Sequence, residues 1–129
     1  MSFYMEKPKT GSTPYILIDE AKGYMKMSEK SFPENPVEFF SDVNAWLDTY
    51  LTTNFGSLVF DFALAYYNSS TLKMITNIFL KMDNASVGDN KVTINWIVDD
   101  DDDIMIESGE DIKEDMHNAA FNLVLTNND

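Results

Sequence analysis

Apolar residues recur along the 129-residue chain in two kinds of pattern. Short runs that alternate with polar residues, or are apolar on both faces, predict β-strands, and apolar residues three or four positions apart predict helices. The predicted strands span residues 14–18, 24–28, 58–67, 91–98 and 119–126. The predicted helices span residues 36–51, a second segment that opens at residues 68–71 and ends before Gly88, and residues 107–116.

The resulting order of elements is β-β-α-β-α-β-α-β. Strands that alternate with helices predict an α/β fold with a mostly parallel or mixed β-sheet and helices packed against it. The length fits one domain over residues 1–129, with the polar residues 1–11 expected as a loose N-terminal lead-in. Residues 58–67 are apolar on both faces except for Asp61, which is typical of a central strand covered on both sides.

Capping signals mark the start of the first helix. Asn35 suits the N-cap position, Pro36 suits the first helical position, and Glu38 stands where a capping box requires an acidic or amide side chain. Gly56 follows the last apolar residue of the helical pattern and is expected beyond the helix end.

Composition narrows the function classes. The chain has 22 acidic residues against 9 basic residues, all of them lysine, and a net charge of −13. Such a surface repels nucleic acid and anionic membranes, and without arginine there is no bidentate phosphate clamp. The absence of cysteine excludes disulfides, thiolate metal sites and a cysteine nucleophile. With no apolar run of membrane-spanning length and no signal peptide, we expect a cytoplasmic protein.

The acidic residues are concentrated in residues 99–115, which hold ten carboxylates and one lysine. Their spacing partly fits a calcium-binding loop, with Asp99, Asp101 and Asp103 at its first, third and fifth positions and Glu110 at its twelfth. Ile104 occupies the position at which such a loop requires glycine, so a solvated acidic loop is the simpler interpretation. Cation (calcium) binding is kept as the alternative function.

Three consecutive hydroxyls, on Ser69, Ser70 and Thr71, stand where a strand passes into a helix. One interpretation is helix capping, in which a hydroxyl accepts from the free N–H groups of the first turn. The other is a phosphorylation switch, because the helix dipole favours a phosphate at this position. Lys73 is the nearest cation. The turn lacks the glycines of a nucleophile elbow, and His117 is the only histidine, so no catalytic set is indicated.

Four stretches of the chain then resemble the SiaC family of small bacterial regulatory phosphoproteins. They are GSTPYILI at residues 11–18, SFPEN at 31–35, YYNSSTLK at 66–73 and WIVDDDDDIMIESGE at 96–110. The resemblance implies a STAS-like fold similar to anti-sigma-factor antagonists, with no enzymatic activity and no cofactor. It also implies partner switching, in which a GHKL-type Ser/Thr kinase phosphorylates the hydroxyl after the motif asparagine and a metal-dependent phosphatase removes the phosphate.

In the best-known system of this family, the unphosphorylated form binds and activates a diguanylate cyclase. The resemblance places the phosphorylation at Ser69, where the family usually has threonine, with Ser70 as the second candidate and Thr71 as the third. The docking surface is predicted to contain Tyr67, Asn68, Ser70, Lys73, Pro33, Glu34 and Asn35. Because the chain has no arginine to read a phosphoserine, the expected mechanism is exclusion of the partner by the added charge.

Overall fold

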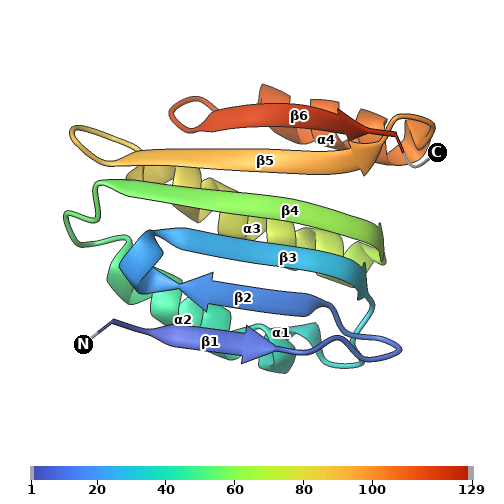
Figure 1. Ribbon diagram of the computed structural model, residues 1–129, viewed down its shortest axis with the longest axis horizontal. Helices are drawn as coiled ribbons and strands as arrows, with labels where there is room; N and C mark the ends of the chain where they lie inside the picture. Colours follow the sequence, from blue (N-terminus) through green and yellow to red (C-terminus); the bar gives the residue numbers. More distant parts are fainter. Residues whose placement is uncertain (1, 128–129) are drawn as a thin grey trace.

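A six-stranded sheet with the strand order β1-β2-β3-β4-β5-β6 organises the protein in the computed structural model, which describes residues 2–127 (Figure 1). The strands are β1 Tyr4–Lys7, β2 Tyr15–Asp19, β3 Tyr24–Ser31, β4 Ser57–Tyr67, β5 Lys91–Asp99 and β6 Ala120–Thr126. The helices are the 3-10 helix η1 Glu20–Lys22 and the α-helices α1 Pro36–Phe39, α2 Ser41–Tyr50, α3 Ser69–Ala85 and α4 Asp103–Glu114.

The sheet is mixed. The first three strands pair antiparallel, and β3, β4, β5 and β6 pair parallel. Each parallel connection carries a helix, as crossover connections require. The predicted α/β class with a mixed sheet and packed helices is therefore confirmed. Of the helices in the described part of the chain, none is long and apolar enough to cross a membrane.

All four α-helices lie on one face of the sheet, behind the strands in Figure 1. The expectation that β4 is covered on both sides is therefore wrong. Leu58, Phe60 and Phe62 are buried beneath the helices, whereas Asp61 on the other face is only partly buried. Residues of the neighbouring strands satisfy the Asp61 carboxylate. The Tyr24 hydroxyl donates to its Oδ2 at 2.7 Å, and Asn95 Nδ2 donates to its Oδ1 at 2.9 Å.

Trp96 occupies the centre of the core between the sheet and the helices. Its fully buried indole stacks on Phe62 with the ring centroids 4.6 Å apart, and its Nε1 donates to the carbonyl oxygen of Met105 at 2.9 Å. Gly109 of α4 lies directly against this ring, where a Cβ atom would come within 2.7 Å of it. A close approach of α4 to β5 therefore depends on this glycine.

The expected loose lead-in at residues 1–11 is wrong, because residues 4–7 form β1 at one edge of the sheet. Met5 pairs with Ile18 and packs against the core, and Lys7 forms a 2.9 Å ion pair with Asp42 of α2. The sequence of β1, YMEK, does not predict a strand, because its charged residues interrupt the apolar pattern. The strand forms because β2 supplies its backbone hydrogen bonds.

Two predicted helices differ in their bounds. The segment predicted as one helix over residues 36–51 is broken at Phe40, whose φ of −91° and ψ of 5° end α1 and begin α2. The third helix begins at Asp103 rather than at residue 107, because Asp102 caps it. The Asn35 cap is confirmed, since its Oδ1 accepts from the Glu38 N–H at 3.2 Å.

Candidate functional site

The carboxyl ends of the parallel strands lie together on one side of the sheet, at the right of Figure 1. The segments that follow β3, β4 and β5 therefore all lie on this side. These segments are residues 32–35, the start of α3 and the acidic residues 100–102. Ligands of open α/β sheets bind preferentially outside the carboxyl ends of the strands. Three of the stretches singled out in the sequence therefore converge on one side of the molecule.

Asn68 caps helix α3. Its Oδ1 accepts a hydrogen bond from the Thr71 N–H at 2.9 Å, and its own N–H donates to the carbonyl oxygen of Ser31 at 3.3 Å. The capping interpretation of the three hydroxyls is therefore wrong, because an amide side chain does that work. The hydroxyls of Ser69 and Ser70 are not needed to start the helix.

The three hydroxyls differ sharply in accessibility. Ser69 and Ser70 are exposed at the first turn of α3, whereas Thr71 is fully buried. The Thr71 hydroxyl donates to the Ser31 carbonyl oxygen at 3.1 Å and lies 3.1 Å from the Ser31 hydroxyl. Modification of Thr71 would require this buried pair to open, so the two serines are the accessible acceptors. Lys73 is exposed one turn further along, and no ion pair joins it to another described residue.

A register shift between β3 and β4 comes just before Tyr66 and Tyr67, the two tyrosines that precede this turn. Glu29 pairs with Leu64, but Lys30 pairs with Tyr66, so Ala65 is the extra residue of a bulge. Glu29 adopts a φ of +79° at the shift. Because a shift of one residue exchanges the two faces of a strand, Tyr66 turns outward and Tyr67 turns toward the core.

Tyr67 is half-buried, and its ring meets the Trp96 ring edge-on with the centroids 6.4 Å apart. Burial raises the pKa of its hydroxyl, and a hydrogen bond with Ser108 opposes that rise. Tyr66 is 51 % exposed and meets Phe32, 38 % exposed, in an edge-on contact at 5.9 Å. Tyr67, predicted for the docking surface, is thus partly accessible, and Phe32 and Tyr66 are the more exposed aromatic residues beside it.

The side chains of the turn at residues 31–35 differ in how accessible they are to a partner. Pro33 is buried, and Asn35 is occupied in capping α1. Glu34 is exposed. Because Ser31 pairs with Tyr67 in the sheet, this turn leaves β3 at the level where β4 passes into α3. The structure thus brings residues 31–35 and 66–73 together, and Glu34 is the predicted side chain of the turn that remains most available.

The acidic stretch does not form the calcium loop that its spacing suggested. Asp102 Oδ1 accepts from the Met105 N–H at 3.2 Å, so the chain turns into α4 after Asp102. Asp103 and Glu110 are then helical residues, and Asp99 is the last residue of β5. Between residues 2 and 127, no group of three or more His, Cys, Asp or Glu side chains is arranged to hold a metal ion. The predicted alternative site of Asp99, Asp101, Asp103 and Glu110 is therefore not formed.

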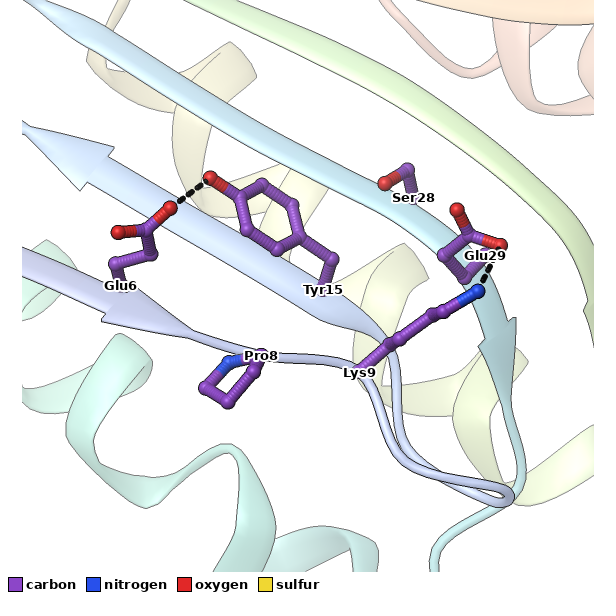
Figure 2. A pocket seen from close by; sticks show the side chains of 6 residues that line it. All are labelled: Glu6, Pro8, Lys9, Tyr15, Ser28 and Glu29. Carbon is purple, nitrogen blue, oxygen red and sulfur yellow. Dashed lines mark hydrogen bonds and ion pairs between the residues drawn. The ribbon is translucent and has the colours of Figure 1, made fainter.

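A hollow of about 650 Å³ lies on the face of the sheet opposite the helices. Figure 2 shows two polar pairs in it, in which the Tyr15 hydroxyl donates to Glu6 Oε2 at 2.6 Å and Lys9 lies 3.7 Å from Glu29. The hydrogen bond to Glu6 raises the pKa of Tyr15 to about 12, so the hydroxyl stays protonated. In these two pairs each carboxylate already has a partner within the hollow.

Known proteins resemble this chain in sequence along most of its length. The sequence model described as SiaC family regulatory phosphoprotein matches residues 7–126. An uncharacterized protein of Pseudomonas aeruginosa is 32 % identical over 108 residues, which cover 84 % of this chain and 86 % of that protein.

Solved structures extend the likeness to the fold. Apo-SiaC of Pseudomonas aeruginosa has a TM-score of 0.80 at 28 % identity, covering 96 % of this chain and 98 % of that chain. SiaC in complex with the diguanylate cyclase SiaD, of which it is the activator, has a TM-score of 0.84 at 29 % identity, covering 96 % and 99 %. The chain belongs to the SiaC family of regulatory phosphoproteins.

Proposed function

We propose that this chain is a non-enzymatic partner-switching regulator whose unphosphorylated form binds and activates a diguanylate cyclase, and that phosphorylation of Ser69 releases the cyclase. The related SiaC forms such a complex with the cyclase SiaD. The observation that carries the proposal is the pair of exposed serines on a helix start that Asn68 already caps. A GHKL-type Ser/Thr kinase and a metal-dependent phosphatase would set the phosphorylation state. Because the cyclase substrate GTP is intracellular, the proposal places the protein in the cytoplasm.

Ser69 is favoured over Ser70 by the resemblance of residues 66–73 to the family motif, in which the acceptor follows the asparagine. Lys73 stands four residues after Ser69 and three after Ser70, so it is a neighbour of both serines on the helix surface, and the choice between them rests on the motif. A phosphate on Ser69 would lie at the positive end of the helix dipole and within reach of one cation. That arrangement tolerates the phosphate in the free protein without holding it through an arginine.

The release mechanism is exclusion. The phosphate adds about −1.5 to −2 charge to a chain whose net charge is already −13, so the global change is small. The local change is large, because docking would have to strip water from a dianion at the centre of the contact. Phe32 and Tyr66 are exposed beside the start of α3, and we expect them to act as aromatic anchors in such a contact.

Charge substitution at the two helix starts tests the position of the switch. Ser69→Ala is expected to fold and to activate the cyclase encoded in the source genome, whereas Ser69→Asp is expected to lose activation. Ser41→Asp is the matched control, because Ser41 is the exposed first residue of α2 and receives the same charge. Full activation by Ser69→Asp, or an equal loss with Ser41→Asp, would contradict the proposed switch.

Mass spectrometry tests the acceptor directly. The protein is incubated with ATP and the kinase, and the modified peptide covering residues 66–73 is fragmented. We expect the phosphate on Ser69 and no phosphorylation of Ser69→Ala. A phosphate mapped to Ser70 or Thr71 would show that the Ser69 assignment is wrong while leaving the fold assignment intact.

A further inference from the structure

The two edges of the sheet are protected to different degrees. The β1 edge is four residues long and carries Glu6 and Lys7, the charged and short form that discourages pairing with another chain. The β6 edge is seven residues long and has no charged residue, no proline and no bulge in its pairing with β5. The longer strand is therefore the less protected one.

The outer side of β6 is open to an incoming strand. In the sheet of residues 2–127, β6 has β5 as its only strand neighbour, so the backbone groups on its other side face outward. Val124 is 37 % exposed and Leu125 is 54 % exposed. Because neighbouring residues of a strand point to opposite faces, an added strand would meet apolar side chains on both faces of the sheet.

Helix α4 gives this edge a strong negative charge. It lies behind β6 in Figure 1 and packs on the sheet through Met105, Gly109 and Ile112. Its exposed side is acidic, with carboxylates at Glu107, Glu110, Asp111 and Glu114 against one lysine, Lys113. The ion pairs within the described chain join lysines to Asp42, Glu29 and Asp48, and none reaches the carboxylates of α4.

The charge of α4 decides which kind of occupant fits. A second copy that paired through its own β6 would bring its own acidic α4 to the same junction, and like charges repel there. A segment that carries lysine or arginine would be attracted instead. Side chains of an added strand that point toward the helical face would lie beside α4, and those on the other face would lie beside Val124.

We propose that the β6 edge binds an extended, basic segment of a protein partner as a seventh strand of the sheet. Main-chain hydrogen bonds to β6 supply the affinity, and basic side chains facing α4 supply the selectivity. The surface is separate from the Ser69 turn, because β5 lies between β4 and β6. Binding at β6 therefore does not depend on the phosphorylation state of Ser69.

The probe is a synthetic peptide of alternating lysine and valine matched in length to β6, titrated into the full ¹⁵N-labelled chain. We expect saturable shifts of the amide resonances of residues 120–126, new protection of β6 amides against exchange, and roughly tenfold weaker binding when salt rises from about 0.05 to 0.5 M. The same peptide with glutamate in place of lysine should not bind.

Matched variants distinguish strand addition at β6 from nonspecific electrostatic attraction of the basic peptide to the acidic protein. Val124→Lys should weaken binding at least tenfold, because it removes an apolar contact and repels the basic peptide, whereas Val87→Lys, which adds the same charge at an exposed valine after α3, should leave it unchanged. The native amide spectrum of each variant verifies folding. Equal effects of the two variants, or shifts confined to residues 99–114, would overturn the proposal. Concentration-dependent changes at β6 without peptide would identify a second copy as the occupant and would overturn it too.

Discussion

Replacement of Gly109 by alanine tests how closely α4 approaches the core. A Cβ at this position would lie 2.7 Å from both Cδ1 and Nε1 of Trp96 and 3.1 Å from its Cε2. The indole cannot retreat easily, because it is fully buried, stacks on Phe62 and donates to the Met105 carbonyl oxygen. Either α4 must move away from β5, or the hydrogen bond of Trp96 must break.

The magnitude follows from two opposing effects. Alanine favours an α-helix over glycine by about 1 kcal/mol. Overpacking of a buried site costs about 1–3 kcal/mol, and a contact with two ring atoms places this site at the upper end or beyond. A distorted hydrogen bond adds about 1 kcal/mol. We therefore expect Gly109→Ala to lower the free energy of unfolding by about 3 kcal/mol and the Tm by roughly 9–15 °C.

Urea denaturation followed by circular dichroism measures this loss, with Gly11→Ala as the control because no atom lies within 4 Å of its added Cβ. Trp96→Phe removes the ring atoms that the new methyl group meets. In that background, Gly109→Ala should cost less than about 0.5 kcal/mol, which gives a coupling free energy well above the additivity error. A stabilisation of Gly109→Ala by about 1 kcal/mol in the native background, as expected for an uncrowded helix glycine, would refute the packing argument.

Two further substitutions test other contacts. Burial alone would raise the pKa of the Asp83 carboxyl, but hydrogen bonds from the backbone N–H groups of Ala119, Asn118 and His117 lower it overall. Its contribution is therefore present above the unfolded pKa of about 4 and is lost as pH falls through the folded pKa, so Asp83→Asn should cost about 2 kcal/mol at pH 7 and progressively less in acid unfolding curves. Asn68→Ala should cost about 1 kcal/mol in thermal unfolding, because it removes the cap of α3, and an unchanged Tm would contradict that role.

Periodicity predicted most of the fold correctly because most elements bury one face. The strand at residues 91–98 alternates strictly and forms β5, and the Asn35 cap is present in the structure. β1 was missed because it is held by pairing with β2 rather than by its own apolar pattern. The break at Phe40 was missed because apolar residues continue across it, so spacing alone does not reveal a change of helix axis.

The candidate site was predictable in its chain positions but not in its surface. The hydroxyls after Asn68 stood out in the sequence, yet only the contact with Ser31 shows that Thr71 is buried. The bulge at Ala65 leaves Tyr66 more exposed than Tyr67, and no local pattern signals that bulge. Long-range pairing, which periodicity does not contain, therefore determines which side chains a partner can reach.

The central claim is that the phosphate on Ser69 itself excludes the cyclase. The most direct measurement is the affinity of the purified cyclase for the chain with phosphoserine incorporated at position 69, by isothermal titration calorimetry. Unmodified protein and protein with phosphoserine at position 41 serve as references. We expect binding at least about 100-fold weaker for phosphoserine at position 69, equivalent to about 2.7 kcal/mol, and little change at position 41. Equal affinity of the unmodified and Ser69-phosphorylated proteins would contradict it.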